Sequence, residues 1–446
     1  MTGLGSFILK PTALSKVLNY ERFLVLLWHL VVTTALFGHF LSWPKLPNIF
    51  AYRILLLLFI IFFIPYARNK GFKLFEGVPQ VIKYYWGGWL VWLSWSAISL
   101  LWAADKLIVM RHIYLIFSSF CLVLFTSLFL SSELRLKRLT LLVFFITLIF
   151  MAIGLWESLT GNHLWVSGVK AKVFTPTAVF HNPNDFAAFL ALALPFMYGM
   201  MRSTRHTILK LAILALLLFG FHLLLRTGGR ASILAVLLEM AVGVWLIAFG
   251  RWGRIVKRGV ITLFLIALIA NSWPGAGEYV SNIMLGQIAN MTEQLNSVSL
   301  ADPSVSNRLK LSLYALQVGS RYYWMGAGGG NAEYHLRQSA SDTMGVSSVH
   351  NWWIELLVDY GAGIWILHVT GYVALTFMLY RVFRTSDSRI LRIWAEVALL
   401  SLTGFSLAVL GPSGVIGLRY FWIIIGFALA VVTCHYTKGN TGSENL

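Results

Sequence analysis

The stretch LTLLVFFITLIFMAIGLWE, residues 139–157, decides the fold class. Its one charged side chain, Glu157, is the last residue. A run of about 20 apolar residues is the length that an α-helix needs to cross a lipid bilayer. Arg135, Lys137 and Arg138 stand directly before the run, as basic residues do at the cytoplasmic end of a membrane helix. The stretch therefore predicts a transmembrane helix that leaves the cytoplasm near residue 139.

Comparable runs occur along the whole chain. The protein is 58% hydrophobic and 12% charged, whereas a soluble protein carries about 25% charged residues. We therefore expect an all-α polytopic membrane protein of about twelve helices, with residues 1–446 as a single membrane domain. The predicted runs are 22–42, 50–67, 86–103, 107–131, 139–157, 184–201, 206–226, 230–250, 258–273, 352–380, 394–411 and 418–435.

The charge pattern sets the expected orientation. The net charge of +18 comes from basic residues in short groups between apolar runs. This distribution follows the positive-inside rule and argues against a nucleic-acid partner. With both termini in the cytoplasm, most basic groups face inward. No cleavable signal peptide is expected, and Cys121 and Cys434 lie inside apolar runs, so neither a disulfide nor a metal site is predicted from them.

Two outward segments are long. One covers about residues 158–183, and the other, 274–351, forms an extracytoplasmic loop between the ninth and tenth predicted helices. Within the second, Leu309, Leu313 and Leu316 recur at helical spacing, which predicts a short interfacial helix. The tenth run contains Gly361 and Gly363, where we expect it to bend.

Several outward polar residues are candidates for function. Arg226 and Arg230 flank the turn at 227–229. Arg226 is best explained as a side chain that reaches the outer headgroups, whereas Arg230 opens a helix and is equally compatible with an anionic ligand. Taken alone, Arg308 is a solvated charge. His350 lies where the loop re-enters the membrane, and a general base is one of its two possible roles.

Other motifs are less specific. The segment GAGGGN at 326–331 lacks the Walker spacing, so it predicts a tight turn and not a nucleotide loop. Asn184 or Asp185 is expected to cap the sixth helix. The acids within predicted helices indicate either a proton or ion path or hydrogen bonds between helices. These acids are Glu239, Glu355, Asp359 and Glu396.

Four stretches, in chain order, resemble the O-antigen ligase and O-antigen polymerase family of bacterial membrane glycosyltransferases. FHNPNDFAA at 180–188 is similar to the family's Asn-Pro-Asn helix opening, and TGGRA at 227–231 is similar to its Ser-x-Ser-Arg turn. Asn307-Arg308, followed by GAGGGN at 326–331, resembles its loop arginine and glycine-rich segment. HNWWIELLVDYGAG at 350–363 resembles its His-Asn signature.

The likeness covers roughly residues 175–380, and it departs from the family where Thr227 and Gly229 replace the usual serines. The resemblance implies transfer of a glycan from an undecaprenyl-diphosphate carrier to lipid A core or another envelope acceptor, outside the inner membrane. It implies inversion at the sugar, with neither metal nor cofactor.

The resemblance also implies roles for particular residues. His350 would accept the proton of the acceptor hydroxyl, while Arg230 and Arg308 would hold the diphosphate. A preorganised cation lowers the barrier because the leaving diphosphate gains negative charge. Further residues are expected around the substrate: Arg226, Asn351, Asn184, Gly328 and Asn331.

Two alternatives stay open. A polymerase of the same fold would use a second carrier-linked glycan as its acceptor, and the sequence does not separate it from a ligase. A transporter of anions or lipid-linked glycans would use Glu239, Glu355 and Asp359 as a polar path. Transporters often carry inverted repeats, and no clear pair is visible in the sequence.

Overall fold

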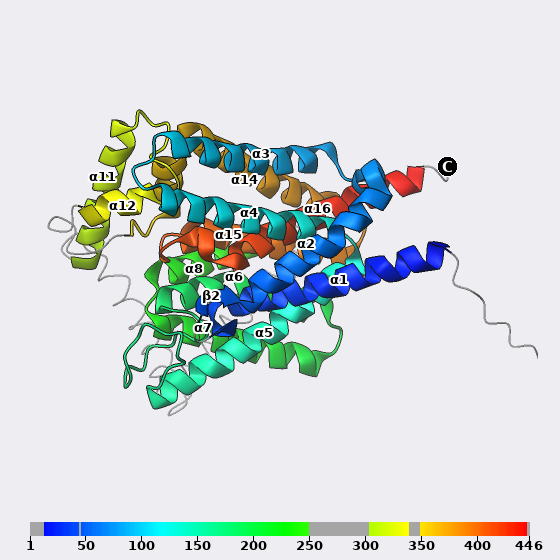
Figure 1. The fold of residues 1–446 in the computed structure, drawn as a ribbon. Helices are drawn as coiled ribbons and strands as arrows, with labels where there is room; N and C mark the ends of the chain where they lie inside the picture. The colour runs from blue at the N-terminus through cyan, green and yellow to red at the C-terminus, as the bar shows by residue number, and fades with distance from the viewer. Residues whose placement is uncertain (1–12, 44–45, 249–302, 339–347, 444–446) are drawn as a thin grey trace, which may run out of the picture.

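The computed structural model describes residues 13–43, 46–248, 303–338 and 348–443 of the chain. Helices make up most of these ranges and lie roughly side by side in one bundle (Figure 1). The helices are α1 Ala13–Phe37, α2 Ala51–Lys70, α3 Gln80–Ile98, α4 Lys106–Phe129, α5 Glu133–Thr160, α6 Pro183–Ser203, α7 Thr207–Thr227, α8 Arg230–Ala248, α11 Pro303–Arg321, α12 Asn331–Gln338, α14 Trp352–Thr385, α15 Arg389–Ala408 and α16 Arg419–Ser443.

Nine helices among the described residues are long and apolar enough to cross a membrane, and each coincides with a predicted run. Two further helices, α3 and α8, occupy the third and eighth predicted runs and pack within the same bundle, on α4 and α15 respectively. The predicted run at 258–273 lies outside the described residues. The prediction of a polytopic helical membrane protein is therefore confirmed, while the number twelve stays a prediction. The nine candidate spans are in α1, α2, α4, α5, α6, α7, α14, α15 and α16.

Three helices form the centre of the bundle. In the apolar part of α16, 83% of the residues are buried within the protein, and in α6 and α15 the share is 72%. In α2 only 22% are buried. Glycine lets α6 and α15 approach each other closely, because a side chain on Gly199 of α6 would come within 2.4 Å of Val397 on α15. Small residues at helix contacts are typical of membrane proteins, because lipid supplies little force to drive apolar helices together. The outer helices turn their apolar surface toward lipid.

The two ends of the bundle differ. The first turns of α1 and the end of α16 lie together at one end, and α11 and α12 lie beyond the other (Figure 1). Between α1 and α2 the chain forms a small antiparallel pair, β1 Ser42–Trp43 and β2 Leu46–Phe50, which the all-helical prediction did not include. The arrangement agrees with termini on one side and a helical loop region on the other.

Helix α14 bends where the sequence predicted. Gly361 has a φ of 87° inside α14, and the backbone of Met325 would come within 2.5 Å of a side chain placed there. Gly326, in turn, has a φ of 100°, and a side chain on it would come within 2.6 Å of the Tyr360 backbone. The glycine-rich segment is therefore a tight turn that packs directly on the kink, because only glycine allows both the backbone angle and the contact.

The cap of α6 differs from the prediction. Asn182, not Asn184 or Asp185, is the N-cap: its side-chain oxygen accepts a hydrogen bond from the Asp185 N–H at 2.9 Å. The Asn182 amide also donates to the Asp185 carboxylate at 2.9 Å. Pro183 at the first helical position explains the shift, because its fixed φ suits the first turn and makes the residue before it, Asn182, the cap.

The predicted interfacial helix is α11, which crosses the end of the bundle (Figure 1). It packs on the protein through Leu311, Ala315 and Val318, which are buried. Leu309 and Leu313 of the predicted apolar stripe are instead 48% and 53% exposed. Leu309 and Leu313 thus lie on the outer face of α11, and contact of this face with lipid stays a prediction.

Candidate functional site

The candidate site is built on the loop that follows α15. An Arg308 guanidinium N–H donates to the Leu410 carbonyl oxygen at 3.4 Å, and Nδ1 of His350 lies 3.2 Å from the Gly411 carbonyl oxygen. Arg308 belongs to α11, and His350 precedes α14, so two separate segments converge on consecutive residues. The structure therefore brings together two of the three residues expected to act in catalysis.

The contact with Gly411 fixes the tautomer of His350. A carbonyl oxygen accepts a hydrogen bond and cannot donate one, so Nδ1 carries the proton of the neutral ring and Nε2 keeps a lone pair. Burial lowers the pKa of His350 below its usual value, and the nearby Arg308 charge lowers it further. The Gly411 and Pro412 carbonyls act in the opposite direction and do not cancel the effect. The ring is therefore a neutral base at neutral pH.

The backbone of His350 is held in an uncommon conformation. Its φ is 52°, in the left-handed region that a non-glycine residue adopts only at some cost in free energy. The His350 N–H donates to Ser348 Oγ at 3.3 Å, and this bond helps to hold the backbone there. Glu355, one turn into α14, lies close enough to interact with Ser348 and with the His350 backbone, so its side chain borders the histidine.

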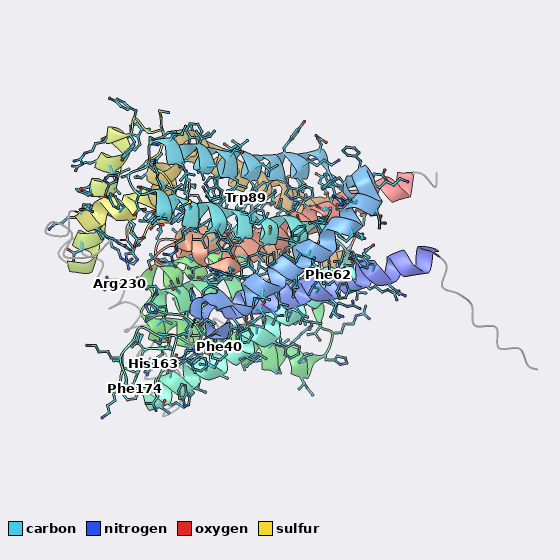
Figure 2. The ribbon with its side chains drawn as sticks, viewed as in Figure 1. Phe40, Phe62, Trp89, His163, Phe174 and Arg230 are labelled. Carbon is cyan, nitrogen blue, oxygen red and sulfur yellow. The ribbon has the colours of Figure 1, made fainter. Side chains whose placement is uncertain are left out.

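Arg230 begins α8 close to this loop. The turn before it is tight, since Gly228 has a φ of 69° and a side chain on Gly229 would come within 2.5 Å of Ala187 on α6. The next residue, Ala231, lies 3.9 Å from the side-chain position of Gly411. Figure 2 shows Arg230 at the end of the bundle that carries α11 and α12. The third expected catalytic residue therefore begins its helix beside the loop that binds the other two.

Asn184 also lies at this loop. Its Cβ is 3.8 Å from the side-chain position of Gly411, and its side-chain oxygen is 3.8 Å from that of Gly229. Because Asn182 performs the capping, the Asn184 amide is available for other contacts near Arg230. Asn184 therefore lies between the loop whose carbonyls bind Arg308 and His350 and the turn that precedes Arg230.

The other four expected residues make contacts elsewhere. Arg226 is exposed and donates to the Ser158 carbonyl oxygen at 3.4 Å, on the α5 side. Asn351 caps α14 by accepting from the N–H groups of Trp353 and Ile354. Asn331 is fully buried and bonds through its side-chain oxygen to the Asp105 N–H at 2.8 Å. Gly328 donates from its backbone to the Asp359 carbonyl oxygen at 2.9 Å.

The buried acids have separate local roles. The Asp359 carboxylate accepts from the N–H groups of Gly330 and Ala332, at 2.9 and 2.8 Å, and so anchors the first turn of α12. Glu239 of α8 fills the space left by Gly404 of α15. Glu396 accepts from Tyr198 at 2.7 Å, in another part of the bundle. In the described part of the chain, these contacts are the inter-segment hydrogen bonds and packing that were expected as the alternative to an ion path.

Two parts of this site carry little signal in the sequence. Leu410 and Gly411 contribute backbone carbonyls, and any residue has a carbonyl, so no side-chain pattern marks them. Glu355 was recognised as an acid within a helix, but its position beside the His350 backbone comes from the folded chain. One available signal was its spacing of five residues from the histidine.

Comparison with known proteins agrees with the resemblance seen in the four stretches. Residues 211–369 match the family model described as O-antigen ligase, and this range contains Arg230, Arg308 and His350. The chain is also 27% identical over 346 residues to the teichuronic acid biosynthesis protein TuaE of Bacillus subtilis strain 168. That alignment covers 76% of this chain and 70% of the relative.

Proposed function

We propose that this chain transfers a glycan from an undecaprenyl-diphosphate carrier to an acceptor hydroxyl, a proposal supported by the match of residues 211–369 to the family model described as O-antigen ligase. The protein is a multi-pass membrane protein. We assign the end of the bundle with α11 and α12 to the outside of the bacterial inner membrane, because most basic residues are expected at the other end.

One observation carries the proposal. A guanidinium and a neutral imidazole are held on consecutive carbonyls, those of Leu410 and Gly411, with the start of α8 beside them. A glycosyl transfer of this kind needs a base for the acceptor and cations for the leaving group, and the arrangement supplies both within one small region.

The reaction balances with these groups. The acceptor hydroxyl gives its proton to Nε2 of His350 while its oxygen forms a bond to the anomeric carbon. The bond between that carbon and the carrier diphosphate breaks, and its electron pair goes to the diphosphate oxygen. Attack from the side opposite the leaving group inverts the sugar. The lowered pKa of His350 keeps the ring neutral and ready for the proton before the reaction.

Arg230 and Arg308 would act on the leaving group. The planar fork of a guanidinium suits phosphate oxygens, and its charge does not depend on pH in the neutral range. Arg230 adds the positive end of the α8 dipole, since it is the first residue of that helix. Asn184 would contact the substrate between them, and roles for Arg226, Asn351, Gly328 and Asn331 in substrate binding stay predictions.

A transfer assay tests the proposal. Purified protein in proteoliposomes is given labelled carrier-linked glycan and an acceptor, and the labelled product is measured. We expect His350→Ala, Arg230→Ala and Arg308→Ala each to abolish transfer while the protein stays folded and inserted. Full activity of the His350→Ala variant would remove the proposed base.

The relative favours a second candidate within the same chemistry. That relative is named as a teichuronic acid biosynthesis protein. A polymerase would pass the growing glycan to a second carrier-linked unit in place of lipid A core. The two functions separate in the same assay: product chains that lengthen on carrier-linked acceptor alone indicate a polymerase, and a product that requires lipid A core indicates a ligase.

The transporter alternative has less support. Asp359, which it would use, is bound to the backbone N–H groups of Gly330 and Ala332 at the start of α12. Uptake of substrate into proteoliposomes that disappears in Asp359→Asn, without any transferase activity, would favour transport over transfer.

A further inference from the structure

Three basic side chains pack against the ring of Phe50 near the start of α2. Phe50 ends β2, caps α2 and is 2% exposed. The guanidinium carbons of Arg53 and Arg419 lie 4.6 and 5.5 Å from the centre of its ring. The imidazole of His39 meets the same ring edge to face, with 4.5 Å between the ring centres. None of these residues belongs to the proposed transfer site, so the cluster requires its own explanation.

Arg419 is the most unusual member. It is 8% exposed, and its Nε has no hydrogen-bond partner within the described part of the chain. Its neighbours include the rings of Phe50 and of Tyr52, the latter at 5.0 Å, and the like charge of Arg53. No carboxylate within the described ranges forms an ion pair with it. A buried charge is strongly destabilising unless it is paired, and contacts with aromatic faces compensate only in part.

The surroundings add positive charge. Arg53 also lies over the ring of Tyr114, at 4.8 Å. Arg111 and His181 are close enough to act electrostatically on His39, as Arg53 and Arg419 do. Both α2 and α16 begin here, and the N-terminus of a helix carries a partial positive charge. All these contributions favour an anion.

The cluster is near the transfer site but separate from it. Tyr420 follows Arg419 in the chain, and its hydroxyl donates to the Asp185 carbonyl oxygen at 3.0 Å. Asp185 follows Asn184, which borders the transfer site on the other side of the start of α6. The cluster therefore lies at the same end of the bundle, with the first turn of α6 between it and Arg230.

We infer that Arg53 and Arg419 form a second anion site, which binds a phosphate group at the membrane boundary. Two guanidinium forks suit the oxygens of a phosphate, which can satisfy the Nε of Arg419 and neutralise both charges. Phospholipid headgroups and soluble phosphate esters share this chemistry. The inference does not depend on glycosyl transfer, because binding at this site is measured without any reaction.

The opposing explanation is a purely structural one, in which Arg419 joins α16 to α2 by packing on Phe50 and Tyr52. A structural role predicts that added phosphate changes nothing. An anion site predicts stabilisation that depends on the phosphate compound and on both arginines. The two explanations therefore differ in a quantity that is measured directly.

The test uses the full-length protein in nanodiscs of phosphatidylcholine. Thermal unfolding is followed while phosphatidylglycerol, or separately soluble glycerol 3-phosphate, is titrated. Arg53→Gln and Arg419→Gln are compared with wild type, and Lys170→Gln, an exposed lysine of the loop between α5 and α6, is the matched loss of one charge. We expect the probe concentration for half-maximal stabilisation to rise about tenfold in the arginine variants and to stay unchanged in Lys170→Gln.

Each outcome decides the inference. Stabilisation by phosphatidylglycerol alone identifies a lipid headgroup as the ligand, and stabilisation by both probes identifies a phosphate site open to soluble groups. The site is overturned if the probe concentration for half-maximal stabilisation is the same in wild type and Arg53→Gln. It is also overturned if that concentration rises as much in Lys170→Gln as in the arginine variants. If Arg419→Gln is not recovered in folded form, Arg53→Gln, whose side chain is only partly buried, decides the question by itself.

Discussion

Arg308 and His350 bind the carbonyl oxygens of adjacent residues, Leu410 and Gly411. One loop therefore holds both side chains, although α12 and the glycine-rich segment separate the two residues in the chain. This coupling has two consequences for the proposed reaction. The guanidinium is held close to the base, and its charge favours the neutral form of that base.

Removal of the Arg308 charge should greatly reduce transfer. We expect Arg308→Gln to lower kcat/KM by about 100- to 1000-fold, the usual effect of losing one preorganised donor to a developing negative charge. Lys310→Gln is the control, because Lys310 is an exposed cation of the same helix. The measurement is the initial rate of labelled glycan transfer. Equal losses in the two variants would indicate a general charge effect and contradict a specific role for Arg308.

The rate of glycan transfer should fall at acidic pH. Burial, and then Arg308, lowers the pKa of His350 below 6.5, so the neutral base predominates at neutral pH. As pH falls through that lowered pKa, the ring takes a proton and can no longer accept one from the acceptor. The acidic limb of kcat/KM should therefore lie below pH 6.5, and in Arg308→Gln the limb of the residual activity should move to higher pH. An acidic limb above about pH 7 in the wild type would contradict this assignment.

Glu355 should act through the backbone of His350. Its side chain lies close to Ser348 and to the His350 backbone, whose φ is 52°. We expect Glu355→Gln to lower kcat about tenfold with little change in KM, because misplacement of a base affects the chemical step. Glu333→Gln, a partly exposed acid on α12, is the control for loss of charge. A change in KM alone would show that Glu355 serves substrate binding instead.

The contact between the glycine-rich turn and the α14 kink should be sensitive to one methyl group. Gly326 has a φ of 100°, and a Cβ there would lie 2.6 Å from the Tyr360 carbonyl carbon. Gly326→Ala is expected to destabilise the protein by about 1–3 kcal/mol and to lower the midpoint of thermal unfolding in detergent. Gly363→Ala is the matched control, because nothing lies within 4 Å of its side-chain position. Equal midpoints for the two variants would contradict the tight contact.

Much of the fold and part of the site were predictable from the sequence. The apolar runs include nine spans that the structure supports, and Gly361 marked the bend in α14. The positions of Arg230, Arg308 and His350 followed from a family resemblance, and the structure brings their segments to one loop. The cap of α6 was placed incorrectly because Asn182, Asn184 and Asp185 are all good capping residues, and the deciding local signal was Pro183, which suits the first helical position and makes Asn182 the cap.

The sequence by itself determined which segments enter the membrane and which residues stand at its boundary. This is possible because the bilayer imposes a length and a cost on each segment independently of the others. Only the tertiary structure decided which groups meet: His350 with Gly411, Asp359 with the turn before α12, and Arg419 with Phe50. These pairings join residues far apart in the chain, several through backbone atoms that every residue possesses, so packing alone selects them.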